Sequence, residues 1–233
     1  MKFTTVFFDA GNTLFREHPL RWEIYARAGR EAGLEIETEA MRRAMIEAHD
    51  ELPERIHGHF RYTDRWFAEY IPRVFARFGA APGQIPGISE RLFASFREPG
   101  TFLLFPETAE VLEEFERRGV RMAVISNWSP RLPGLCKTLG LDRYLRFILA
   151  SAVEEMEKPD PAIFRRALTM IGASPEEALH VGDSLEKDVQ GAASTGILGV
   201  LLDREGRREP PLGAPRIRSL RELAPIVEKG IAP

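Results

Sequence analysis

Cysteine is almost absent from this chain of 233 residues, with Cys136 as its single example. One thiol cannot form an intrachain disulfide or a metal site built from several cysteines, so both are excluded. No apolar run approaches the roughly 20 residues that span a membrane. The apolar run that opens the chain is short and stops at Asp9, which favours a strand over a signal peptide. We therefore expect a cytoplasmic protein with no membrane partner.

A large excess of charge of either sign is also missing. The chain has 32 Lys and Arg against 35 Asp and Glu, a net charge of −3 and a pI of about 6.0. Without a basic surface, no nucleic-acid partner is expected. Lysine is scarce, since only five are present and residues 16–98 contain none, and the only asparagines are Asn12 and Asn127. The length allows one sizeable core and a smaller second domain.

After residue 100 the sequence alternates between short apolar strands and amphipathic helices. This alternation predicts an α/β fold in which a parallel sheet carries helices on both faces. A Pro- and Gly-rich surface connection is expected at Glu209–Pro215. The predicted strands are Thr4–Phe8, Met122–Ile125, Phe147–Ala150, Ala178–Val181 and Leu198–Leu202, and the predicted helices are Pro106–Arg118, Pro130–Leu139, Asp160–Ile171, Glu186–Ser194 and Leu220–Glu228.

Residues 16–98 break the alternation and have helical periodicity only. Helices are predicted at Trp22–Ala32, Thr38–His49, Thr63–Phe78 and Ser89–Phe96. An all-helical block placed after the first strand of an α/β sheet indicates a cap domain. We thus expect a core of residues 1–15 and 99–233 and a helical cap of residues 16–98.

Asp9 follows the first apolar strand and opens the turn Ala10-Gly11-Asn12-Thr13. The carboxyl edge of a parallel sheet is where α/β folds place their sites. A carboxylate there can act as a metal ligand, or attack phosphorus and form an aspartyl-phosphate. An aspartate at the end of a strand can equally be an ordinary turn residue.

Three further segments carry groups that such a nucleophile would need. Ser126 ends the predicted strand at 122–125 and could hold a phosphoryl oxygen, or could belong to a simple Ser-Asn turn. Lys158 could neutralise a carboxylate and a phosphate, or could pair with nearby glutamates at the surface. Asp183 and Asp188 follow the strand at 178–181 and, with Asp9, would form an all-oxygen site that suits Mg²⁺. Asp188 could instead orient Lys158.

The order of these motifs is more specific than any one of them. The sequence resembles the haloacid dehalogenase-like hydrolase superfamily through strand-Asp9, strand-Ser126, Lys158-Pro159 and Gly182-Asp183. The wider motifs Val124–Asn127, Lys158–Phe164 and His180–Asp183 resemble one branch of this superfamily, the haloacid dehalogenase-like domain-containing protein 3 (rhythmically expressed gene) branch. The resemblance covers nearly the whole chain, and it implies a Rossmann-like core with an inserted all-helical cap.

The resemblance also implies roles for individual residues. It gives Asp9 as the nucleophile, Ser126 as a phosphoryl binder and Lys158 as the charge neutraliser. Substrate binding is expected at Thr13, Asn127, Ser126 and Lys158. The Mg²⁺ ligands implied are Asp9, the backbone carbonyl of Gly11, Asp183 and Asp188. The expected activity is that of a Mg²⁺-dependent phosphatase acting on a small phosphorylated metabolite.

One position departs from the family pattern. Phosphatases of the family usually carry a second aspartate two residues after the nucleophile, and this chain has Gly11 there. The missing side chain protonates the leaving oxygen, which is typically worth about 10²–10⁴-fold in rate. Three outcomes remain open: a slow phosphatase, a preference for leaving groups such as acyl phosphates, or an acid/base supplied by the cap from His57, His59 or Tyr62. The His-Gly-His segment is equally consistent with plain polar surface.

Two alternative functions stay beside the phosphatase. Phosphonate-cleaving relatives need a cap lysine, which residues 16–98 lack. Haloacid dehalogenases usually lack the Gly-Asp motif, but Asp9 could also attack carbon, so a 2-haloacid dehalogenase-type hydrolase remains possible. The other alternative is a catalytically impaired protein that binds phosphate and Mg²⁺. Replacing Gly11 with Asp is the change that we expect to discriminate between the enzyme and the binding protein.

Overall fold

The computed structural model describes residues 1–207 and 213–230, so most of the predicted connection at 209–215 lies outside the described residues. The chain divides into two compact units, of which the first contains Met1–Arg16 and Leu104–Pro233 and the second contains Glu17–Leu103. Within the described ranges, no helix is both long enough and apolar enough to cross a membrane.

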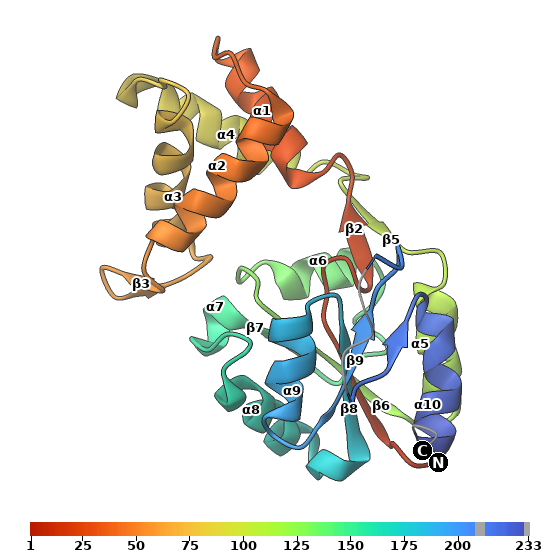
Figure 1. Ribbon diagram of the computed structural model, residues 1–233. Helices are drawn as coiled ribbons and strands as arrows, with labels where there is room; N and C mark the ends of the chain where they lie inside the picture. The colour runs from red at the N-terminus through yellow and green to blue at the C-terminus, as the bar shows by residue number, and fades with distance from the viewer. Residues whose placement is uncertain (208–212, 231–233) are drawn as a thin grey trace. The chain divides into compact units, whose positions relative to one another are not determined.

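A six-stranded parallel sheet forms the centre of the first unit (Figure 1). The pattern of the sequence predicted five of these strands. The sixth, a two-residue edge strand at Arg216–Ile217, is too short to leave a periodic signal. In spatial order the strands are β10 (Arg216–Ile217), β9 (Leu198–Leu202), β8 (Ala178–Gly182), β1 (Thr5–Phe8), β6 (Arg121–Ser126) and β7 (Ile148–Ala150).

Strand β1 lies in the middle of this sheet because all four of its residues are apolar or uncharged and fully buried. Phe8, its last residue, lies opposite Val124 of β6 and Val181 of β8. The chain runs from β1 to β6 and β7 on one side and then returns to β8 and β9 on the other. The carboxyl ends of β6, β1 and β8 therefore meet at the switch point where α/β folds bind ligands.

Helices cover both faces of the sheet, as the alternating pattern predicted. In Figure 1, α5 (Thr108–Arg117) and α10 (Leu223–Lys229) lie on one side, and α8 (Pro161–Ile171) and α9 (Gly191–Ala193) lie on the other. Between the sheet and these two helices lies an apolar cluster that includes Phe7, Ile125 and Phe164. The unit also contains the short helices α6 (Leu132–Thr138) and α7 (Ser151–Glu154) and the 3₁₀ turns Pro175–Glu177 and Leu220–Glu222.

The predicted helix at 186–194 is wrong in type. Residues Leu185–Gln190 form a π-helix, and only Gly191–Ala193 continue as an α-helix. A π-turn is rare and is frequently found at functional sites. Here it brings the side chain of Asp188 back toward the end of β8, where Ser184 N donates to its carboxylate.

The second unit contains the four predicted helices, α1 (Arg21–Glu31), α2 (Thr38–Glu51), α3 (Asp64–Ala76) and α4 (Ile85–Ser95), with a 3₁₀ turn at Pro82–Gln84. It is not all-helical, because β3 (Arg55–Ile56) and β4 (His59–Phe60) form a hairpin. His57 and Gly58 make its two-residue turn at φ of 49° and 80°. Aromatic residues, among them Trp66, Tyr70 and Phe75, fill the core of this unit.

Strands β2 (Phe15–Glu17) and β5 (Phe102–Leu104) pair with each other where the chain passes from one unit to the other. The second unit consequently ends at Leu103, beyond the predicted limit of 98. The sequence pattern missed both strands because each has only three residues.

Candidate active site

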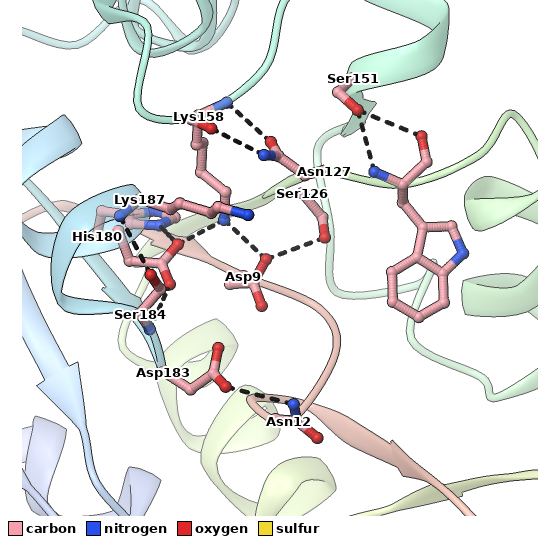
Figure 2. Close-up of polar contacts among 12 residues, drawn as sticks. Asp9, Asn12, Ser126, Asn127, Ser151, Lys158, His180, Asp183, Ser184 and Lys187 are labelled. Atoms are coloured by element: carbon pink, nitrogen blue, oxygen red, sulfur yellow. Dashed lines mark hydrogen bonds and ion pairs between the residues drawn. The ribbon is translucent and has the colours of Figure 1, made fainter. Parts of the chain in front are cut away.

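Asp9 lies directly after β1, and two other motifs converge on one of its oxygens (Figure 2). Ser126 Oγ at the end of β6 donates to Asp9 Oδ1 over 2.9 Å, and Lys158 Nζ donates to the same oxygen over 2.7 Å. All three side chains are buried. The structure thus brings together the predicted nucleophile, the predicted phosphoryl binder and the predicted charge neutraliser.

Asn127 fixes the backbone of Lys158. Its Nδ2 donates to the Lys158 carbonyl and its Oδ1 accepts from Lys158 N, both over 2.8 Å (Figure 2). Both polar atoms of the amide are therefore used in holding Lys158 in place. Substrate binding by Asn127 stays a prediction, and the observed contacts favour a positioning role instead.

Asp188 is the second carboxylate partner of Lys158. Its Oδ1 accepts from Lys158 Nζ over 2.5 Å and from His180 Nε2 over 2.9 Å, and its Oδ2 accepts from Ser184 N over 2.9 Å. Burial alone would raise the pKa of Asp188, but the charge of Lys158 and the bond from His180 hold that pKa well below its usual range. Asp188 is thus an ionised anchor for Lys158.

His180 lies within β8 and is fully buried, with its ring edge-on to Phe164. Burial lowers the pKa of His180, so its neutral form donates from Nε2 to the Asp188 carboxylate. No hydrogen-bond partner for His180 Nδ1 is found in the described parts of the chain. Burial would also lower the pKa of Lys158, but the carboxylates of Asp188 and Asp9 raise it, and the lysine remains a cation.

Three carboxylates gather beside Lys158. One oxygen from each of Asp9, Asp183 and Asp188 lies within 4.8 Å of the others. Asn12 Nδ2 donates to Asp183 Oδ2 over 3.3 Å and so links the loop after Asp9 to the loop after β8 (Figure 2). This cluster of three carboxylates and one ammonium carries a net negative formal charge. An all-oxygen donor set with this charge suits a hard divalent cation.

The electrostatics of the aspartates fit the same interpretation. Burial, together with the nearby charges of Asp9 and Asp188, raises the pKa of Asp183 to about 6. Burial raises the pKa of Asp9 as well, although Lys158 opposes that shift. A cation bound between Asp9 and Asp183 would stabilise the ionised form of both carboxylates.

The loop after Asp9 places the remaining predicted residues. It makes one tight turn in which Leu14 N donates to the Ala10 carbonyl, and Asn12 takes a left-handed φ of 57°. Thr13 is fully buried, and its hydroxyl has no hydrogen-bond partner among the described residues. Substrate binding by Thr13 stays a prediction, which this burial does not favour. Gly11 is partly exposed beside the ring of Trp128.

Arg204, just after β9, is a residue that sequence reasoning missed. Its guanidinium donates to the carbonyls of Asn12 and Thr13 over 3.3 and 2.8 Å and pairs with Glu107 over 2.6 Å. It also stacks on the ring of Phe105. Arg204 therefore holds the loop that follows Asp9, although it lies 195 residues further along the chain. No local sequence pattern indicates this role.

The residues expected to replace the missing acid/base belong to the second unit. His57 and His59 are exposed in the β3–β4 hairpin. Tyr62 OH lies 3.0 Å from His49 Nε2, within the aromatic group that includes Trp66. An acid/base role for His57, His59 or Tyr62 stays a prediction.

Replacing Gly182 with Ala is expected to destabilise the protein and disorder the site. A Cβ at Gly182 would lie 2.2 Å from Asp188 Cγ, so Asp188 would have to leave Lys158 and His180. The loss should be about 2–4 kcal/mol of unfolding free energy by urea titration, because overpacking and the weakening of a buried ion pair both destabilise the fold. Gly134→Ala in α6 is the control, because its Cβ meets nothing within 4 Å. Equal stability of the two variants would contradict the tight packing of Asp188.

The chain is similar to known hydrolases over most of its length. A family model described as haloacid dehalogenase-like hydrolase matches residues 3–196. The human haloacid dehalogenase-like hydrolase domain-containing protein 3 is 34% identical over 200 residues, which cover 83% of this chain and 79% of that protein. The phosphoserine phosphatase of Thermus thermophilus is 37% identical over 165 residues, covering 68% of this chain and 65% of that protein.

A solved structure can be superposed on nearly the whole chain. The crystal structure of a HAD phosphatase from Thermococcus onnurineus aligns with a TM-score of 0.69 at 26% identity, covering 97% of this chain and 98% of that one. The sheet and its flanking helices are therefore arranged as in a known phosphatase.

Proposed function

Since the chain belongs to the haloacid dehalogenase-like hydrolase family, we propose that it is a Mg²⁺-dependent phosphatase of a small phosphorylated metabolite, with Asp9 as the nucleophile. The relatives support phosphate chemistry, since a phosphoserine phosphatase and a HAD phosphatase are among them. The site residues that we assign are Asp9, Ser126, Lys158 and Asp183, with Asp188, Asn127 and His180 as positioning residues.

One observation carries this proposal: Asp9 Oδ1 is held by both Ser126 and Lys158 at the edge of a group of three carboxylates. A buried carboxylate oriented by two donors is fixed for attack and loses little entropy on reaction. A site that only stabilised the fold would gain little from three carboxylates in one small volume, because their mutual repulsion is costly.

In the first step, an oxygen of Asp9 forms a bond to phosphorus while the bond between phosphorus and the leaving oxygen breaks. Lys158 and the Ser126 hydroxyl offset the charge on the phosphoryl oxygens as they move from substrate to Asp9. Asp188 and Asn127 keep Lys158 in place during this transfer. In the second step, water forms a bond to phosphorus while the bond between phosphorus and the Asp9 oxygen breaks. Inorganic phosphate leaves with one proton of the water, the other passes to solvent, and the Asp9 carboxylate is regenerated.

The residues present fit a divalent cation. Asp9, Asp183 and the Gly11 carbonyl would hold it, while Asp188 already binds Lys158, His180 and Ser184. When bound, Mg²⁺ would screen the repulsion between the Asp9 carboxylate and the phosphate dianion and orient the phosphoryl group.

The test is phosphate release from a panel of phosphomonoesters and acetyl phosphate, measured with Mg²⁺ and with EDTA. We expect turnover of at least one substrate that EDTA abolishes and Mg²⁺ restores. Chloride release from 2-chloropropionate, measured in parallel, tests attack at carbon. Turnover of 2-chloropropionate alone, unaffected by EDTA, would overturn the phosphatase in favour of a dehalogenase.

A phosphate-binding protein without turnover is the second candidate, and the absence of an acid/base side chain at Gly11 favours it. Mg²⁺-dependent binding of inorganic phosphate, without hydrolysis of any panel member, would select this candidate. Multiple turnovers by the unmodified protein would exclude it.

The stabilisation of the protein by Mg²⁺ is expected to depend on pH with a midpoint near the pKa of Asp183. Because that pKa is raised to about 6 by burial and by Asp9 and Asp188, folding favours the protonated form. Without metal, the contribution of Asp183 to stability is thus lost as the pH rises from about 4 through about 6. A bound cation requires the ionised form and offsets this loss.

We therefore expect Mg²⁺ to raise the Tm clearly at about pH 7.5 and hardly at all at about pH 5. Thermal unfolding in Mg²⁺ and in EDTA across this range measures the effect. Asp183→Asn is the control variant, and its Tm should respond to neither Mg²⁺ nor this titration. An equal rise in Tm at both pH values would show that Asp183 is not a ligand.

A further inference from the structure

Trp128 and Gly11 occupy the two sides of one small volume next to the nucleophile. A Cβ at Gly11 would lie 2.9 Å from Cζ3 of the Trp128 ring, 3.6 Å from Cη2 and 3.9 Å from Cε3. Real Cβ atoms are not found closer than about 3 Å to other heavy atoms. The six-membered ring of the indole therefore lies against the position that the first atom of a side chain at residue 11 would take, and one of the two would have to shift.

The position of Trp128 is set by several contacts. Its N–H donates to Ser151 Oγ over 3.1 Å, and its carbonyl accepts from Ala152 N over 3.2 Å, which ties its backbone to the start of α7. Its ring meets the ring of Phe15 edge-on with centroids 5.6 Å apart. Phe15 is fully buried and is bridged to Gly11 by the backbone. Displacing the indole would break the aromatic contact, so the ring opposes a larger residue 11.

We propose that Gly11 restricts the site to phosphates whose leaving group departs without a proton, and that Trp128 is a positioning residue whose indole keeps an acid/base side chain out of position 11. This rests on the proposed phosphatase activity. The substrate class is acyl phosphate: when the bond from phosphorus to the acyl oxygen breaks, the electron pair stays on a carboxylate, which is stable at neutral pH. An alkyl phosphate would release an alkoxide, which needs the general acid that Gly11 cannot supply.

The proposal changes what the restoring substitution at Gly11 should do. With the indole in place, the Cβ of Gly11→Asp lies too close to the ring, so the new carboxyl is misplaced and adding it alone is not expected to restore alkyl phosphate hydrolysis. Shortening Trp128 at the same time opens the volume. The two positions should therefore act together rather than additively.

The experiment compares the wild type, Gly11→Asp, Trp128→Ala and the double variant on acetyl phosphate and glycerol 3-phosphate. The readout is the ratio of kcat/KM for the alkyl over the acyl substrate, in which any damage common to both substrates cancels. We expect a strong acyl preference in the wild type and no gain in the ratio for Gly11→Asp. The double variant should exceed Trp128→Ala by about 10²-fold, the low end for a general acid. A rise in this ratio for Gly11→Asp alone that matches the rise in the double variant would overturn the proposal. The absence of an acyl preference in the wild type would overturn it as well.

Measurements of Tm test the packing of Trp128 against Gly11 separately from the effect on hydrolysis. Gly11→Ala should lower the Tm by about 3 °C or more in the wild type but by less than about 1 °C in Trp128→Ala, since only the former keeps the indole. Gly134→Ala, whose Cβ meets nothing within 4 Å, is the control in both backgrounds. If no protein in the set releases phosphate, the proposed function fails, and a coupled loss of Tm still supports the packing of Trp128 on Gly11. Equal losses of Tm in the two backgrounds would overturn the packing itself.

Discussion

Replacing Asp9 with Asn is expected to lower the rate of phosphate release by about 10⁴-fold or more, the scale seen when a nucleophile is removed from an assembled site. An amide is a poor nucleophile and cannot carry the phosphoryl group. The fold should persist, because the Asn Oδ1 can still accept from Ser126 and Lys158, as Asp9 Oδ1 does over 2.9 and 2.7 Å. Phosphate release with Mg²⁺ in excess, alongside a Tm measurement, checks both parts.

Asp142→Asn is the matched control for this change. Asp142 is exposed and belongs to none of the contacts around Asp9, so its variant should keep the wild-type rate. A residual rate for Asp9→Asn within about tenfold of the wild type, with Mg²⁺ still required, would show that phosphorus is attacked by water rather than by Asp9.

Replacing Lys158 with Met is expected to have the largest effect on stability. Lys158 is 2% exposed and pairs with Asp9 over 2.7 Å and with Asp188 over 2.5 Å. Without it, two buried carboxylates lose their common cation, which typically costs about 3–5 kcal/mol. The rate should fall by about 10²–10³-fold as well, because a donor to the transferring group is lost. Urea unfolding and phosphate release measure the two losses.

Lys187→Met is the control, since Lys187 is an exposed lysine of the neighbouring π-helix and should lie within about 0.5 kcal/mol of the wild type. The double variant Lys158→Met with Asp188→Asn keeps the test meaningful if the single variant does not fold. Removing the unpaired Asp188 charge should return part of the stability without returning activity. Wild-type stability of Lys158→Met would mean that the ion pair contributes nothing to the fold.

The periodicity of the sequence was enough to predict most of the fold. The uncharged and mostly apolar run at Thr5–Phe8 is typical of a central parallel strand, and the structure places it between β6 and β8. Asp160 begins the predicted helix at 160–171, and its side chain caps α8 by accepting from Ala162 N. Strands of two or three residues, such as β3, β4 and β10, escaped because a period of two needs a longer segment to be visible.

The site was predictable to the extent that its residues end strands. Parallel strands bring their carboxyl ends to one edge, so the meeting of Asp9, Ser126 and Asp183 followed from chain order. The choice between Asp188 as a metal ligand and Asp188 as a partner of Lys158 could not be made in the same way. It depends on the π-turn at 185–190, and the sequence between Ser184 and Gly191 has no marker for the i→i+5 hydrogen-bond spacing of such a turn.

By itself, the sequence determined the class of fold, the order of the motifs and the missing side chain at position 11, because these depend on residue type and spacing along the chain. The tertiary structure decided how each polar group is used: Asn127 on the backbone of Lys158, His180 on Asp188, and Arg204 on the carbonyls of the nucleophile loop. It also decided that the indole of Trp128 fills the space beside Gly11. These contacts join residues that are distant in the chain, and only the packing of the folded protein brings them within bonding distance.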